Sequence, residues 1–161
     1  MDPALPDTHP AFKWQVWTME GGMGEGIKIV EAFLRTLESR DLDKLGELVT
    51  EDIIYSNPPS PAHLGRQAMT EFLSFNYKRM DGSSCTIHHW AENETGTVVM
   101  NERTEYMHFG DKKAGATFMG IFEIRDGKIC AWRDYWDHAS FAAQMAAIGQ
   151  AAGPGINNSS S

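Results

Sequence analysis

The stretch from Cys130 to Asp137 places one acidic side chain among apolar ones. Its pattern predicts a strand, in which residues two apart share a face, so Asp134 shares a face with Cys130, Trp132 and Trp136. We expect so apolar a face to turn toward the core. An aspartate is rarely buried without a partner, because its charge then loses the stabilisation that water provides. Asp134 therefore needs a cationic or hydrogen-bonding group inside the protein.

A suitable partner lies on a second predicted strand, residues 97–109. Arg103 and Glu105 are two positions apart and share one face of this strand. Adjacent strands of one meander would bring that face within a few ångströms of Asp134, and a planar guanidinium can donate to both carboxylates at once. The resulting array fits two interpretations, a pair of carboxylates used in acid–base catalysis or an inert buried network.

Two more polar residues precede a proline-rich bend. Tyr55 and Asn57 share a face of a short predicted strand, residues 52–57, which ends at Pro58-Pro59-Ser60-Pro61. A phenol and an amide can hold a water molecule by two hydrogen bonds. A water molecule held in this way beside an aspartate can act as a nucleophile once a base accepts its proton. The alternative is a tyrosine at the edge of the core and an asparagine in a turn.

The hydrophobic periodicity predicts the elements that position these residues. We expect one helix over 26–39, a second that begins after Asp41 as its cap, a third that follows Gly65, and a fourth from His138 to about 149. Strands are expected over 84–92, 97–109, 114–125 and 128–137. Helices followed by an antiparallel meander are typical of an α+β fold, with a curved sheet and helices packed on one side.

Composition and charge set the broad class. The 161 residues, 42% of them hydrophobic, are enough for one core. A net charge of −8 opposes binding to nucleic acid. The first residues have neither a basic start nor an apolar run, so we expect no membrane association and a cytoplasmic location. The predicted organisation is an extension over 1–24 that docks on the domain or on a partner subunit, one domain over 25–149, and a tail over 150–161.

The sequence predicts no metal site and no reactive thiol. His88 and His89 are adjacent and point to opposite faces of a strand, so they cannot share a metal ion. Cys85 and Cys130 are expected to be small buried residues without a chemical role.

Five segments, in order along the chain, resemble the limonene-1,2-epoxide hydrolase family: Ile27–Phe33, Asp52–Asn57, Leu64–Ala68, Asn101–Glu105, and Gly127–Ile129 running into Trp132–Asp137. The resemblance covers about residues 25–145. It implies a nuclear transport factor 2-like (SnoaL-like) cone, in which a strongly bent, mainly antiparallel sheet and its helices enclose a deep pocket. It also implies catalysis without a cofactor, and a homodimer.

Carried over position by position, the resemblance implies that Asp134 is the general base, that Tyr55 and Asn57 hold the water with it, and that Arg103 bridges the carboxylates. Glu105 stands at the position of the general acid, where the family typically has an aspartate. The extra methylene moves the carboxyl group by roughly one bond length, and a displacement of about 1 Å can cost on the order of 100-fold in rate. Either the pocket is shaped around Glu105 or epoxide opening is impaired.

The predicted reaction is one-step addition of water to a lipophilic epoxide, giving a vicinal diol without a covalent intermediate. The apolar walls of the pocket are expected to come from Trp132, Trp136, Phe118, Met119, Met80 and Phe75. Two alternatives stay open. One is an epoxide-opening cyclase, or an enzyme like the ketosteroid isomerases and polyketide cyclases, on the same fold. The other is a small-molecule binding protein that has kept the fold without the chemistry.

Overall fold

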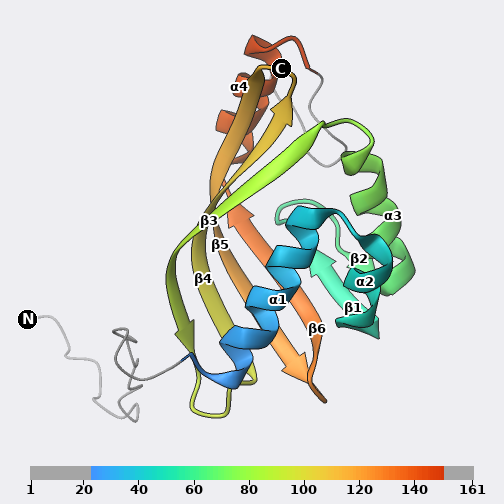
Figure 1. Cartoon of the computed structure of the whole chain (residues 1–161), viewed down its shortest axis with the longest axis vertical. Helices are drawn as coiled ribbons and strands as arrows, with labels where there is room; N and C mark the ends of the chain where they lie inside the picture. Colours follow the sequence, from blue (N-terminus) through green and yellow to red (C-terminus); the bar gives the residue numbers. More distant parts are fainter. Residues whose placement is uncertain (1–22, 151–161) are drawn as a thin grey trace, which may run out of the picture.

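The computed structural model describes residues 23–150, which form one six-stranded sheet and four helices (Figure 1). In chain order the elements are α1 (Glu25–Ser39), α2 (Leu42–Glu47), β1 (Val49–Ser56), β2 (His63–Leu64), α3 (Arg66–Tyr77), β3 (Gly82–Glu92), β4 (Val98–Phe109), β5 (Lys112–Arg125), β6 (Lys128–Trp136) and α4 (His138–Ala147). Residues 1–22 and 151–161, nearly all of the predicted extension and tail, lie outside the described residues. No helix within 23–150 is long and apolar enough to cross a membrane.

The sheet is mixed, with the strand order β2-β1-β6-β5-β4-β3. The last four strands of the chain form the predicted antiparallel meander, and β1 joins its end by pairing parallel with β6. The sheet is strongly curved, with α1 and α3 on one side of it and α4 at its upper end (Figure 1). The α+β fold with a curved, mainly antiparallel sheet is therefore confirmed.

Helix α1 carries the predicted apolar stripe into the core. Ile27, Val30 and Phe33 are fully or almost fully buried. The Phe33 ring meets the Trp132 ring edge-on, with 5.1 Å between ring centroids, so the helix packs directly on β6.

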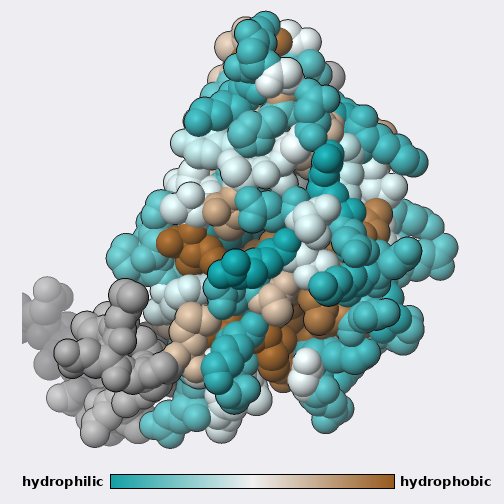
Figure 2. Space-filling view, in the orientation of Figure 1, coloured by the Kyte–Doolittle hydropathy of each residue, from teal (hydrophilic) through white to brown (hydrophobic). Residues whose placement is uncertain are grey.

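The molecular surface, seen from the side shown in Figure 1, is mostly hydrophilic, and its hydrophobic side chains form small separate areas (Figure 2).

Carboxylates stabilise the N-terminal starts of α1 and α2. The side chain of Asp41 accepts a hydrogen bond from the backbone N–H of Lys44 at 3.0 Å, which confirms the predicted cap of α2. The Glu92 carboxylate, at the end of β3, accepts from the backbone N–H of Ile27 at 3.1 Å. This contact joins the first turn of α1 to β3, the edge strand of the sheet. It is favourable because a carboxylate stabilises the free N–H groups at a helix start.

Strand β6 contains an irregularity that the sequence pattern did not reveal. Its pairing with β5 runs from Ala131 to Ile129 without a partner for Cys130, so Cys130 is the extra residue of a β-bulge. The bulge shifts the alternation of faces. Ile129 therefore takes the core position, and Cys130 is half-buried with its thiol directed to the carbonyl oxygen of Glu123. The expectation that Cys130 shares the core face with Asp134 is wrong for this reason.

Candidate active site

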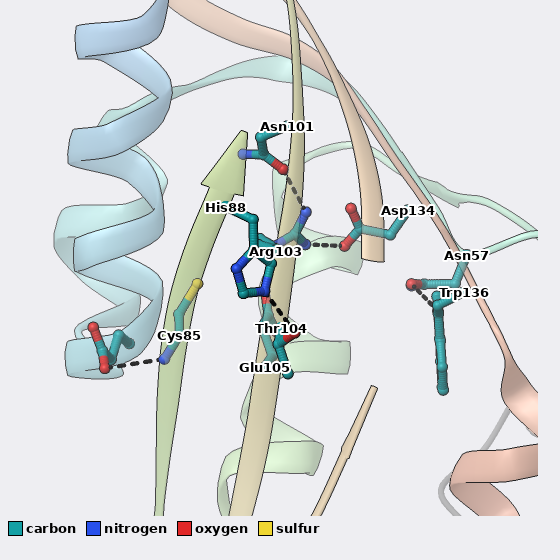
Figure 3. A network of polar contacts seen from close by, with 10 residues as sticks. Asn57, Cys85, His88, Asn101, Arg103, Thr104, Glu105, Asp134 and Trp136 are labelled. Carbon is teal, nitrogen blue, oxygen red and sulfur yellow. Dashed lines mark hydrogen bonds and ion pairs between the residues drawn. The ribbon is translucent and has the colours of Figure 1, made fainter. Parts of the chain in front are cut away.

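A buried guanidinium joins the polar residues predicted from β4 and β6. The Arg103 side chain is 0% exposed. Its Nε donates to Oε1 of Glu105 at 2.5 Å. Its Nη2 donates to Oδ2 of Asp134 at 2.6 Å (Figure 3). Its Nη1 donates to Oδ1 of Asn101 at 3.0 Å. The predicted Glu-Arg-Asp array is therefore present, with Asn101 as a fourth member that the sequence analysis did not identify.

The members of the array come from β4 and β6, and the array crosses the strand between them. The expectation that the strands of Arg103 and Asp134 are adjacent is wrong, because β5 lies between β4 and β6. At the crossing point, Gly120 of β5 pairs with Asn101 on one side and with Asp134 on the other. The guanidinium reaches its second carboxylate by passing over this glycine. Arginine is long enough to make that crossing, since its charged group lies at the end of a four-bond side chain.

Burial and charge oppose each other at Asp134, whose side chain is 3% exposed. Burial raises the pKa of Asp134, the Arg103 guanidinium lowers it, and the Glu105 charge raises it further; the net shift is upward. For Arg103, burial lowers the pKa but the two carboxylates raise it more, so its charge is secure. Oδ1 of Asp134 is buried and takes no part in the bond to Arg103. The Trp132 indole Nε1, also buried without a hydrogen-bond partner among the described residues, lies close enough to lower the pKa of Asp134. One oxygen of this carboxylate is thus anchored by Arg103 and the other is not.

The parallel pairing of β1 with β6 places Tyr55 and Asn57 on the same side of the cavity as Asp134. Tyr55 pairs in register with Trp132, and their rings stack with 4.0 Å between centroids. Burial raises the pKa of Tyr55 and the charge of Asp134 raises it further, while a hydrogen bond with Asn57 opposes the shift. The phenol therefore stays protonated at neutral pH. Asn57 follows the last residue of β1, Ser56, and lies in the bend that the prolines were expected to form.

Trp136 fixes the orientation of Asn57. Its indole Nε1 donates to Oδ1 of Asn57 at 3.1 Å (Figure 3), and its ring is held between Phe118, His138 and Phe141. The sequence analysis expected Trp136 only as an apolar wall. A donor role could not be predicted from spacing, since the two residues are 79 positions apart.

A cavity of about 390 Å³ contains these groups. Tyr55, Asn57, Glu105 and Asp134 all lie on its wall, and so do four of the six expected apolar residues, Met80, Phe118, Trp132 and Trp136. Other aromatic and sulfur-containing residues of the wall were not predicted, namely His63, Phe72, Tyr77, Cys85, Tyr106, Met107, Phe109, His138, Phe141 and Met145. They come from five different elements, so no single periodic segment could have revealed them.

Phe75 and Met119, the other two expected wall residues, lie elsewhere. Met119 is 46% exposed because it follows Phe118 on β5 and therefore points to the opposite face of the sheet. Phe75 is 48% exposed and lines an open groove beside α2, with the Arg79 guanidinium 5.4 Å from its ring centroid. The expectation that these two residues form pocket walls is wrong.

Cys85 is the one thiol on the cavity wall as the structure describes it. It pairs in register with Glu105 across β3 and β4. Burial, with a smaller contribution from Glu105, raises the pKa of Cys85 to about 12. The thiol is therefore protonated at neutral pH and is a poor nucleophile. Within residues 23–150, no group of histidine, cysteine, aspartate and glutamate side chains has an arrangement that would hold a metal ion.

Known proteins are similar to this chain in sequence and in fold. Epoxide hydrolase EphG of Mycobacterium tuberculosis is 32% identical over 108 residues, which cover 67% of this chain and 70% of EphG. The structure of an M. tuberculosis LEH-like epoxide hydrolase matches with a TM-score of 0.67 and 29% identity, over 76% of this chain and 90% of that one. The fold alone is shared with SalBIII, an epoxide hydrolase/cyclase-like enzyme in pyran ring formation in salinomycin, at a TM-score of 0.64 and 19% identity, over 72% and 93% of the two chains.

The family model matches over the same part of the chain that builds the cavity. The model for the limonene-1,2-epoxide hydrolase catalytic domain covers residues 24–147, from the start of α1 to the end of α4. This match and the relative with 32% identity agree with each other, and the chain belongs to the limonene-1,2-epoxide hydrolase family.

Proposed function

We propose that the protein hydrolyses a lipophilic epoxide to a vicinal diol in one step, with water as the nucleophile. One observation carries this proposal: Asp134 lies on the cavity wall, with Oδ2 anchored by Arg103 and Oδ1 buried without a bond to Arg103. A carboxylate oxygen held in this way is suited to accept a proton from a water molecule beside it. Tyr55 and Asn57, on the same wall, supply the polar groups that hold this water.

The proposed step uses both carboxylates in opposite protonation states. The water oxygen forms a bond to an epoxide carbon while its proton passes to Oδ1 of Asp134. The carbon–oxygen bond of the ring breaks, and a protonated Glu105 gives its proton to the departing oxygen. The product is a diol, with Asp134 protonated and Glu105 ionised. The cycle closes when one proton leaves Asp134 and one returns to Glu105, whose side chain is 25% exposed.

Arg103 has a role in both halves of this step. Its charge favours the ionised form of Asp134, which must accept a proton, and its three hydrogen bonds fix both acidic groups relative to each other. A fixed geometry matters because the two proton transfers accompany one attack. The raised pKa of Asp134 makes its carboxylate a stronger base than an ordinary exposed aspartate.

The nature of the cavity supports a lipophilic substrate. A volume of about 390 Å³ lies within the range of small-molecule sites, and most of its wall is apolar or aromatic. The carboxylates and the Tyr55–Asn57 pair are then among the polar groups that orient the ligand. No carboxylate needs to reach carbon, so the reaction requires no ester intermediate.

The test is diol formation from a panel of cyclic and aryl-substituted epoxides in water enriched in oxygen-18. The proposal expects one solvent oxygen in each diol and activity near background in Asp134→Asn, with Asp137→Asn as control. Asp137 is exposed and caps α4, and asparagine serves equally well as a cap. Activity retained by Asp134→Asn would overturn the assignment of the base.

Two other results would favour the alternatives. A cyclic ether that carries no solvent oxygen would identify an internal hydroxyl as the nucleophile, and hence a cyclase. Stabilisation of the protein by epoxides without any turnover would indicate a binding protein on this fold.

A further inference from the structure

The acid–base array depends on a crossing between strands that do not touch. Arg103 lies on β4 and Asp134 on β6, and Gly120 of β5 lies between them, in register with Asn101 and with Asp134. The guanidinium therefore occupies the space directly over the Gly120 backbone. Gly120 has no left-handed backbone conformation, so its φ angle does not explain why glycine stands at this position. The explanation has to come from space.

A side chain at position 120 would collide with the array. A Cβ atom built on Gly120 lies under 3.0 Å from Nη1 of Arg103, Oδ1 of Asn101 and Cε2 of Phe122, a separation that real Cβ atoms essentially never show. The guanidinium cannot yield easily, because three hydrogen bonds hold it. The Phe118 and Phe122 rings also confine it, at 5.0 and 5.9 Å from their centroids to Cζ.

We propose that Gly120 is a positioning residue for catalysis: its missing side chain leaves the space that Arg103 occupies between Glu105 on its own strand and Asp134 on β6. This inference rests on the proposed epoxide hydrolysis. Displacing the guanidinium separates it from Asp134. The pKa of Asp134 then rises further, because Arg103 no longer offsets the effect of burial. The same displacement moves Glu105, because Nε of Arg103 holds its carboxylate. One added methyl group would therefore disturb acid and base together.

The first experiment compares Gly120→Ala with Gly82→Ala. Gly82 begins β3, and a Cβ atom there meets nothing within 4 Å, so this variant controls for the loss of a glycine from a strand. Gly120→Ala is expected to lower kcat/KM on the order of 100-fold and to move the acidic limb of the pH profile to higher pH. A loss of folded protein alone would scale the rate and leave that limb in place. An unchanged rate, or a lowered rate with an unmoved limb, would overturn the proposal.

A second measurement needs no activity and remains informative if Gly120→Ala is unstable. It is a double-mutant cycle on the free energy of unfolding, with Gly120→Ala introduced into the wild type and into Arg103→Lys. Lysine lacks the Nη1 atom that the new Cβ would strike, so Gly120→Ala should destabilise the Arg103→Lys protein less than it destabilises the wild type. Equal destabilisation in both backgrounds, or loss of folding in both, would overturn the steric basis.

The two measurements separate failure of this inference from failure of the proposed function. A wild type that converts no epoxide in the panel would refute the proposed function, while the unfolding cycle would still report whether Gly120 makes room for Arg103. A wild type that forms diols, combined with equal costs in the cycle, would refute the role of Gly120 alone.

Discussion

Glu105 reaches Arg103 along its own strand, two positions away, and its longer side chain places Oε1 against Nε. We expect Glu105→Gln to lower diol formation by at least about 100-fold, because an amide keeps the size of the side chain but is a poor proton donor. Glu105→Asp should also lower turnover of the native substrate, since the shorter side chain retracts the carboxyl group from the epoxide oxygen. Initial rates and thermal unfolding are measured side by side on both variants.

Two outcomes would contradict an acid role for Glu105. Unchanged turnover in Glu105→Gln would remove it from the chemistry, and lower stability without a specific kinetic defect would favour an inert buried network. A gain of weak activity on simple cyclic epoxides in Glu105→Asp would show instead that the pocket is not adapted to glutamate.

Trp136 offers a test of how Asn57 is held. Trp136→Phe removes the N–H donor to Oδ1 of Asn57 and keeps an aromatic ring in the same packing. One hydrogen bond is worth about 0.5–1.5 kcal/mol, so we expect kcat to fall roughly 2- to 10-fold with little change in KM. Trp90→Phe, a half-buried residue packed against the core, is the matched control. Equal kcat values in the wild type and Trp136→Phe would show that Asn57 does not need this contact.

Among the elements, β4 was predicted well and the relation between strands was not. The alternation along residues 97–109 correctly placed Arg103 and Glu105 on one face, because an unbroken strand has a strict period of two. The predicted meander, with a strand over 114–125, already places β5 between β4 and β6, so the expected adjacency of the strands of Arg103 and Asp134 was inconsistent with it. The parallel pairing of β1 with β6 was not predicted, because it depends on long-range contacts.

The bulge at Cys130 and the strand β2 show two further limits of sequence reasoning. A bulge inserts one residue without changing the residue types, so alternation alone predicts the wrong face beyond it. Strand β2, His63–Leu64, has only two residues and carries no periodicity. Even so, His63 packs its ring on Tyr55 and lines the cavity. Such contacts depend on tertiary packing rather than on local pattern.

The contact between Glu92 and α1 gives a prediction for an element remote from the chemistry. Glu92→Gln should lower the free energy of unfolding by about 1 kcal/mol, because an amide interacts less favourably than a carboxylate with free N–H groups at a helix start. Urea unfolding measures this change. Glu94→Gln, at an exposed position nearby, is the control and should change little. A Glu92→Gln protein as stable as the wild type would show that the helix start does not depend on this charge.

For the whole molecule, activity and the contribution of Asp134 to stability should respond to pH in opposite directions. Asp134 must be ionised to accept a proton, and burial raises its pKa above the ordinary value of 3.8. Activity is therefore expected to fall, as pH is lowered, at a higher pH than an exposed aspartate would give. An acid with a raised pKa in the folded state favours folding when protonated, so the contribution of Asp134 to stability is present at low pH and lost as pH rises through that pKa.

Unfolding experiments across this pH range, on the wild type and on Asp134→Asn, measure the contribution of Asp134. The wild type should lose stability relative to Asp134→Asn as the pH rises through the raised pKa. Parallel stability curves for the two proteins would contradict the assigned direction of the shift.

We also propose that the molecule works as a homodimer. Met119 and Tyr135 pair across β5 and β6, and both are exposed on the outer face of the sheet, where a second copy would cover them. Sedimentation should then give twice the mass of the chain, and Met119→Glu should shift the equilibrium toward monomers. A wild type that sediments as a monomer at micromolar concentration would refute the proposal.

The parallel pairing of β1 with β6 also has a consequence for how the protein is made. Tyr55 and Asn57 are synthesised early, but their partners Trp132, Asp134 and Trp136 come from the last strand. A large loop must close before these residues meet, and such contacts form slowly compared with those of a hairpin. A growing chain on the ribosome can therefore form much of the β3–β5 meander while it still lacks the proposed base, Asp134. The proposed epoxide hydrolysis becomes possible only when β6 emerges and pairs with β1 and β5.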